Sequence, residues 1–123
     1  ALGLCYLEAI DDILKAKREI LEAYRHLHPG FDWQDIPLDT NGYVAAALVP
    51  FPNDIKEANP NWEFRDYYQS AVNEDDELVT FQDDMLLKDG SPHLKNTRIV
   101  SRHILAFPSY PEMPIQWIEE LKT

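Results

Sequence analysis

Apolar residues recur at helical spacing over the first quarter of the chain. Between residues 7 and 27 they fall on one side of a helix, with charged residues largely on the opposite side. This period matches one face of an α-helix and predicts a long amphipathic helix. Pro29-Gly30 follows, a pair typical of a helix C-terminus. The apolar positions are Leu7, Ile10, Ile13, Leu14, Ile20, Leu21, Tyr24 and Leu27.

The next two apolar runs predict a β-hairpin. Residues 31–38 and 43–49 flank Asn41-Gly42, and both residues of that pair tolerate the positive φ of a tight turn. We therefore expect two antiparallel strands joined at this turn. Three prolines then mark a loop over residues 50–61, with one helical turn around residues 54–58.

Helical spacing resumes from Trp62 to Val72, with Asn61 as the expected N-cap. The acidic run of residues 74–77 is too polar for a core and predicts a surface loop. It precedes a strand candidate at residues 78–81.

The last third of the chain predicts two more strands and a short helix. The turn residues of Lys88–Pro92 precede residues 97–107, a run rich in β-branched side chains. A short C-terminal helix is expected over residues 115–121, because Pro114 suits a first helical turn.

Together these elements predict one α+β domain over residues 1–123. A long N-terminal amphipathic helix packs on an antiparallel sheet, and a short helix closes the chain. Strands come in pairs instead of alternating strictly with helices, which favours antiparallel over parallel pairing.

Composition and charge narrow the class of partner. The chain has 123 residues, 45% hydrophobic and 11% aromatic, enough to bury a core. A net charge of −11 repels phosphate backbones and anionic lipid surfaces, so nucleic acid is not an expected partner. No run approaches the roughly 18 apolar residues of a membrane span.

Few residue patterns suggest catalysis, and we expect no enzyme activity and no cofactor. Cys5, the single cysteine, lies among apolar helix positions, which predicts a buried thiol. His26 and His28 lack a metal-ligand pattern and suit the negative end of the helix dipole instead. Asp83-Asp84 with Asp89-Gly90 lack the ligand spacing of a calcium loop, so a metal site is not predicted.

Arg65, Tyr67 and Tyr68 form the strongest candidate site. A guanidinium binds a carboxylate bidentately, and phenols donate hydrogen bonds or offer ring faces to a cation. Together they predict a pocket for an amino acid, an amine or a carboxylate. The alternative is structural: Arg65 pairs at the surface with Glu63 or Asp66, and Phe64 and Tyr67 are core residues.

Three motifs in succession resemble Cache sensor domains, the PAS-like extracytoplasmic modules of bacterial chemoreceptors and sensor kinases. They are Asp39-Thr40-Asn41-Gly42-Tyr43-Val44, Arg65-Asp66-Tyr67-Tyr68-Gln69-Ser70-Ala71 and Lys88-Asp89-Gly90-Ser91-Pro92. The resemblance spans about residues 4–107. It implies a PAS-like fold and a sensory domain that binds a small molecule.

The same resemblance implies roles for single residues. Arg65, Tyr67 and Tyr68 match positions that contact ligand in such sensors, and Asp83 or Asp84 would supply an acidic contact. It also implies a homodimer through the N-terminal helix, biased by ligand binding between the 62–72 helix and the sheet. The location implied is the extracytoplasmic part of a membrane receptor; otherwise a cytoplasmic location is expected.

A rival hypothesis comes from the charge. An acidic interaction module, such as an immunity protein or a phage-encoded inhibitor, would cover a basic surface of a protein partner. Its support is the net charge of −11 and the acidic clusters at residues 11–12, 74–77 and 83–84.

Overall fold

The computed structural model describes residues 2–35, 37, 41, 44–65 and 95–123. Five helices and three strands follow one another along these residues. The helices are α1 (Leu2–Glu8), α2 (Ile10–Leu27), α3 (Pro52–Ala58), α4 (Lys95–His103) and α5 (Ile115–Glu119), and the strands are β1 (Asp32–Trp33), β2 (Ala45–Leu48) and β3 (Ile104–Phe107). The α+β class with an antiparallel sheet is therefore confirmed.

The described strands form one antiparallel sheet in the order β1-β2-β3. Trp33 lies opposite Ala47, and Ala47 lies opposite Leu105. The predicted antiparallel pairing after the first helix is confirmed, although both strands are shorter than predicted. Of the predicted turn, Asn41 is exposed and Gly42 lies outside the described residues.

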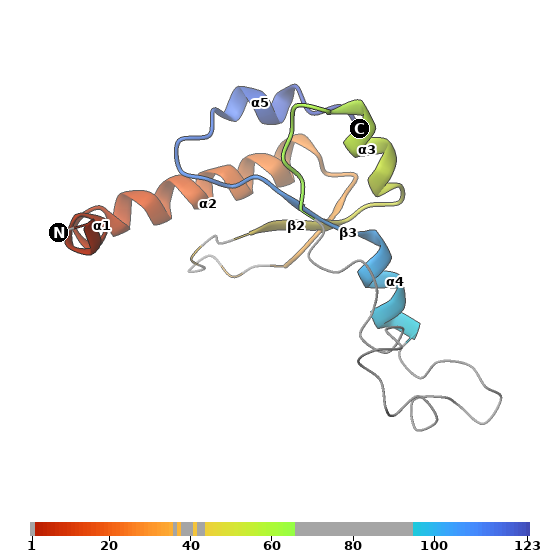
Figure 1. The fold of residues 1–123 in the computed structure, drawn as a ribbon, viewed down its shortest axis with the longest axis horizontal. Helices are drawn as coiled ribbons and strands as arrows, with labels where there is room; N and C mark the ends of the chain where they lie inside the picture. Colours follow the sequence, from red (N-terminus) through yellow and green to blue (C-terminus); the bar gives the residue numbers. More distant parts are fainter. Residues whose placement is uncertain (1, 36, 38–40, 42–43, 66–94) are drawn as a thin grey trace.

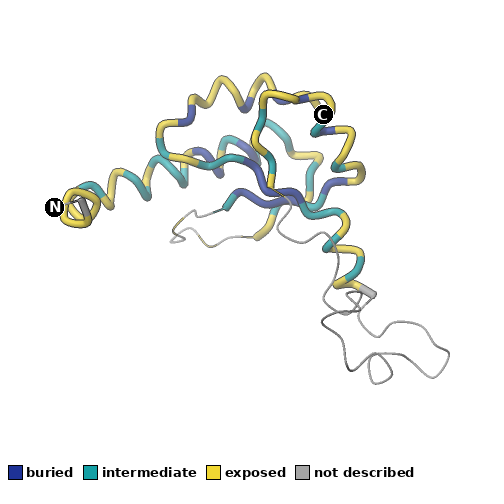
Figure 2. The backbone as a smooth tube through the Cα atoms, viewed as in Figure 1, coloured by how far each residue is buried: buried dark blue, intermediate teal, exposed yellow. Residues whose placement is uncertain are grey.

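Helix α2 packs its C-terminal half against the sheet and contacts α5 (Figure 1). Ile20, Leu21 and Tyr24 are its buried residues, and they join alternate residues of β2 and β3 in one core. Burial is concentrated in the two longer strands and the inner turns of α2 (Figure 2). Tyr24 is fully buried and contacts the rings of Trp33, Trp62 and Phe107.

The predicted first helix is confirmed, but it contains one break. Ala9 has φ −100° and ψ 4° and separates α1 from α2, although its N–H still donates to the Cys5 carbonyl oxygen. The helix ends before Pro29 as predicted, with His28 as C-cap.

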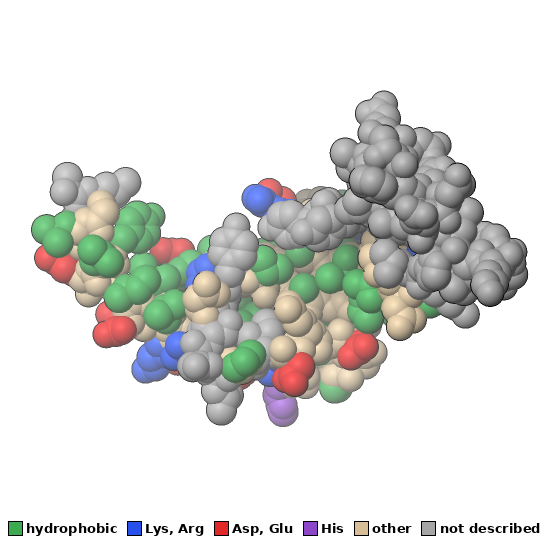
Figure 3. Space-filling view, turned by 90° about the horizontal axis from the view of Figure 1, so that it is seen from below, with side chains coloured by type: hydrophobic (Ala, Val, Ile, Leu, Met, Phe, Trp, Pro, Cys, Tyr) green, Lys and Arg blue, Asp and Glu red, His purple; other side chains and the backbone are tan. Residues whose placement is uncertain are grey.

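The prediction that Cys5 is buried is wrong. Helix α1 extends beyond the sheet, so Cys5 is exposed, as are Leu4 and Leu7 at 60% and 69%. Apolar side chains are visible on this end of the molecule (Figure 3). Apolar spacing predicted the helix correctly, but only its C-terminal half lies over the sheet.

The predicted helix over residues 62–72 is wrong for the residues that the structure describes. Trp62 to Arg65 are non-helical, and Arg65 forms an isolated antiparallel bridge with Ala106. Asn61 is therefore no N-cap. The rest of this segment and the strand candidate at residues 78–81 lie outside the described residues.

The prediction of strands over residues 97–107 is correct only for the last four residues. Residues 95–103 form α4, and β3 begins at Ile104, opposite Leu48. Beyond this pair the Val49 N–H still donates to the His103 carbonyl oxygen at 2.9 Å, and the pairing ends there because the residues before Ile104 belong to α4. The predicted helical turn around residues 54–58 and the C-terminal helix after Pro114 are confirmed as α3 and α5.

Candidate functional site

Arg65 lies at the surface next to β3. Its N–H donates to the Ala106 carbonyl oxygen at 3.0 Å, and the Ala106 N–H donates back at 3.2 Å. Its Nη2 lies 3.1 Å from Glu63 Oε1, an ion pair between side chains that are 61% and 78% exposed. The surface pairing that the sequence allowed is therefore present. Tyr67, Tyr68 and Asp83 lie outside the described residues.

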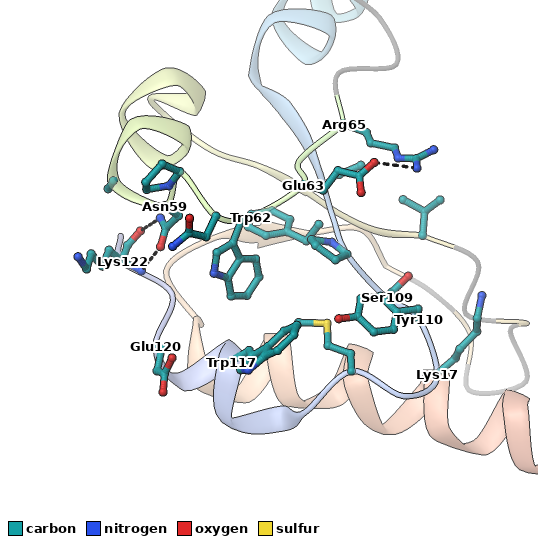
Figure 4. Close-up of a pocket in the computed structure, with 18 of the residues that line it drawn as sticks. Lys17, Asn59, Trp62, Glu63, Arg65, Ser109, Tyr110, Trp117, Glu120 and Lys122 are labelled. Atoms are coloured by element: carbon teal, nitrogen blue, oxygen red, sulfur yellow. Dashed lines mark hydrogen bonds and ion pairs between the residues drawn. The ribbon is translucent and has the colours of Figure 1, made fainter.

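A cleft of about 840 Å³ opens beside Arg65. One wall is the segment between α3 and Arg65, a second is the chain after β3, and a third is α5 with the C-terminal residues (Figure 4). Lys17 reaches it from α2. The described lining is Lys17, Val44, Ala58, Asn59, Pro60, Asn61, Trp62, Glu63, Arg65, Ala106, Phe107, Pro108, Ser109, Tyr110, Pro111, Met113, Trp117, Glu120 and Lys122.

Aromatic side chains dominate the apolar part of the cleft. Trp62 points into it from one wall, Trp117 rises from α5 on the opposite wall, and Tyr110 enters from the side (Figure 4). Trp117 is 48% exposed and Tyr110 is 42% exposed, so both rings are accessible. Phe107 also belongs to the lining, but its ring is buried and packs on Tyr24 and Phe64.

Trp62 is held in place by other rings. It stacks on Phe64 with ring centroids 5.8 Å apart and meets Tyr24 edge-on at 6.5 Å. Phe64 in turn packs edge-on against Phe107 at 5.4 Å. This wall is therefore an extension of the core, and the packed rings hold Trp62 in a fixed orientation.

Hydrogen bonds fix the other two walls. The Tyr24 hydroxyl donates to the Pro108 carbonyl oxygen at 2.8 Å. His28 Nε2 lies 2.6 Å from the Ile118 carbonyl oxygen; because a carbonyl oxygen only accepts, the ring nitrogen carries the proton. Burial, followed by the proximity of Tyr110, raises the pKa of the Tyr24 phenol above its ordinary value, so Tyr24 stays a donor.

The cleft is less acidic than the chain as a whole. Among the described lining residues are three of the 11 Lys and Arg residues but only two of the 22 Asp and Glu residues. Lys17 and Arg65 lie toward one end, whereas Glu120 and Lys122 lie toward the other (Figure 4). The Lys17–Arg65 end is therefore the part most favourable for an anion.

The groups in the cleft suit binding. Its described lining includes no histidine, cysteine or aspartate. Within the described ranges, no three His, Cys, Asp or Glu side chains are grouped so that they could hold a metal ion. Aromatic faces, three cations and the Asn61 amide offer shape, charge and hydrogen bonds to a small molecule.

Sequence reasoning found Arg65 but missed the aromatic walls. Tyr110 belongs to the proline-rich segment that interrupts the chain, and Trp117 belongs to the predicted C-terminal helix, to which no site was assigned. One signal was available: Ile118 is the buried residue of α5, and the adjacent Trp117 therefore lies on another side of this short helix.

No family model matches the chain, and a search of curated proteins finds no similar sequence. Over the described residues, no helix combines the length and the apolar character that a membrane crossing requires.

Proposed function

We propose that this chain is a small-molecule-binding domain whose ligand occupies the cleft between Trp62 and Trp117. The observation that carries the proposal is the cleft itself. Its volume of about 840 Å³ lies within the range of roughly 300–1,000 Å³ that ligand pockets occupy. Accessible aromatic rings and a few charged groups line it, which is the composition of a binding pocket.

Arg65 supplies the ligand's charge partner in this proposal. Its backbone is tied to β3 through Ala106, while its guanidinium is 61% exposed at the rim. A guanidinium on an anchored strand binds a carboxylate with directional hydrogen bonds. Tyr67, Tyr68 and Asp83 remain predicted contacts of an amino acid, amine or carboxylate ligand.

A sensory role is the part of the proposal that rests on the resemblance to Cache domains. One structural feature supports it: α2 lines the cleft through Lys17 and contacts α5, which carries Trp117. A ligand that draws these walls together would shift α2 by its differential affinity for the two positions. In this proposal the shift of α2 is passed to a homodimer that forms through the N-terminal helix, and neither catalysis nor a cofactor is involved.

The alternative, an acidic interaction module, draws on the net charge of −11 and on the exposed pair Asp11-Asp12 at the start of α2. It predicts a basic protein partner and no dependence on a small molecule. The cleft favours the ligand-binding proposal.

A thermal-shift screen of amino acids, amines and carboxylates tests the proposal. A ligand at 100 times its Kd stabilises the native state by about 2.7 kcal/mol, which raises Tm by several degrees. Arg65→Ala should abolish most of the shift caused by a carboxylate. Arg102→Ala is the matched control, because Arg102 is exposed on α4 and does not line the cleft. A screen without any stabiliser, or a ligand whose affinity survives Arg65→Ala, contradicts the proposal.

A further inference from the structure

We infer that the cleft selects a planar aromatic carboxylate, with the ring between Trp62 and Trp117 and the carboxylate toward Lys17 and Arg65. This inference rests on the proposed function and specifies its ligand class. It follows from the accessibility of the rings, their placement on opposite walls and the separation of charge along the cleft.

Trp117 is the first observation. Among the described residues it makes no ring contact and no side-chain hydrogen bond, and 48% of it is exposed. The neighbouring Ile118 is fully buried in the core, so α5 needs no contribution from Trp117 to be held in place. A large ring that the core does not use, directed into a cleft, provides a face for a ligand.

The second observation is that the opposite wall also presents an indole. Trp62 enters the cleft from the segment between α3 and Arg65, and Trp117 enters from α5 (Figure 4). Trp62 is supported from behind by Phe64, at an interplanar angle of 16°. A planar ring between two indoles gains contact on both faces, whereas a saturated ring of the same size cannot lie flat on either.

The third observation sets the sign of the ligand charge. Lys17 and Arg65 lie toward the same end of the cleft on different walls, and of the two acidic residues in the described lining Glu63 is the nearer to Arg65 (Figure 4). Glu63 already pairs with Arg65 at 3.1 Å, so its charge is partly neutralised. Among the described lining residues at this end, two cations stand against one carboxylate, a balance that favours an anion over an amine.

Tyr110 adds an aromatic contact. It is 42% exposed and enters the cleft between the Trp117 wall and the Lys17 end (Figure 4). Its hydroxyl lies close enough to the Tyr24 phenol to influence the pKa of that group, so the part of Tyr110 offered to an aromatic ligand is its ring. An aliphatic amino acid would use only the charged end of this cleft and would leave both indoles in water.

A matched set of three probes tests the inference by nuclear magnetic resonance on the full chain. Phenylacetate has a planar ring and a carboxylate, cyclohexylacetate keeps the carboxylate on a puckered ring, and phenethylamine keeps the ring with a cation. The indole N–H signals of Trp33, Trp62 and Trp117 are assigned from single Trp→Phe variants. We expect phenylacetate to shift the Trp62 and Trp117 signals and to leave Trp33, which does not line the cleft, largely unchanged.

Phenylacetate should bind about tenfold more tightly than cyclohexylacetate or phenethylamine. Ring stacking and charge pairing each change the affinity by roughly that factor. Trp117→Ala should weaken phenylacetate about tenfold, and Trp117→Phe should retain affinity within about threefold. Because Trp117 is half exposed, both variants should fold.

Three outcomes overturn the inference in distinguishable ways. If cyclohexylacetate or phenethylamine shifts the cleft signals with equal or greater affinity, the ligand class is wrong while a small-molecule site stands. If phenylacetate shifts only Trp33 or binds Trp117→Ala unchanged, the ring position is wrong. If no probe shifts the indole signals of Trp62 or Trp117 and no compound of the thermal-shift screen raises Tm, the proposed function fails as well.

Discussion

The side-chain amide of Asn59 pairs with the backbone of Lys122. Asn59 Nδ2 donates to the Lys122 carbonyl oxygen at 2.8 Å, and the Lys122 N–H donates to Asn59 Oδ1 at 2.9 Å. The same Nδ2 donates to the Ile55 carbonyl oxygen at 2.7 Å. One buried amide thus joins the end of α3 to the C-terminal residues and fixes two walls of the cleft relative to each other.

Asn59→Ala should therefore destabilise the native state strongly. Asn59 is 5% exposed, and its removal leaves the Lys122 N–H and two carbonyl oxygens without partners. Each unsatisfied buried group costs about 1–3 kcal/mol, so we expect a loss of about 3 kcal/mol in urea denaturation. Asn53→Ala, an exposed change on α3, should stay within about 0.5 kcal/mol of wild type. Similar small losses in both variants would show that the Asn59 contacts do not stabilise the fold.

The pH dependence of stability should carry a signature of Tyr24. Burial raises the pKa of its phenol above the ordinary value of about 10, so the unfolded chain releases this proton first as pH rises. The stabilisation is complete below pH 10 and decreases above it, by at most about 1.4 kcal/mol per pH unit. Denaturation midpoints measured between pH 9 and 11 test this expectation. The Tyr24→Phe variant keeps the ring contacts, and its stability should decrease less steeply with pH. Parallel pH profiles of the variant and the wild type would show that the Tyr24 phenol does not cause the loss.

The sequence predicted those elements whose signals are local. Apolar spacing up to Leu27, followed by Pro29, predicts a helix and its end, and both are confirmed. Pro114 before an apolar turn likewise predicts α5. The strand propensity of residues 97–103 gave a wrong prediction, because a strand needs a partner and β2 ends at Leu48, opposite Ile104. The helical spacing at Trp62 failed for a related reason, since Arg65 pairs with Ala106 across about 40 residues.

Of the candidate site, the sequence could predict which residues stand out, but not which come together. Arg65 was singled out by its neighbours in sequence, whereas the cleft joins it to Lys17 and Trp117 through tertiary packing alone. Exposure of Cys5 was missed for the same reason: periodicity shows which side of a helix is apolar, not how far the sheet extends beneath it.

That exposure leads to a chemical prediction for Cys5. An exposed thiol on α1 should react with a disulfide reagent in native buffer at a rate within about fivefold of that in urea. A buried thiol would react only after unfolding. The rate at which the reagent releases its thiol is measured in native buffer and in urea. The Cys5→Ser variant gives the background rate. A native rate lower by orders of magnitude would indicate that α1 is covered, as in a homodimer through this helix.

The ion pair beside the cleft allows a test of charge in the proposed site. Glu63 competes with an anionic ligand for Arg65, and its side chain is 78% exposed, so Glu63→Gln should leave stability within about 0.5 kcal/mol. Without the competing carboxylate, phenylacetate should bind about threefold more tightly, whereas phenethylamine should bind more weakly. Titration of both probes at low and high salt measures the change, which screening should reduce. Glu57→Gln, an exposed change on α3 outside the cleft lining, is the control. If Glu63→Gln and Glu57→Gln changed the affinity for phenylacetate equally, the cause would be the net charge of the chain. If Glu63→Gln bound phenethylamine more tightly, an anion at this end of the cleft would be excluded.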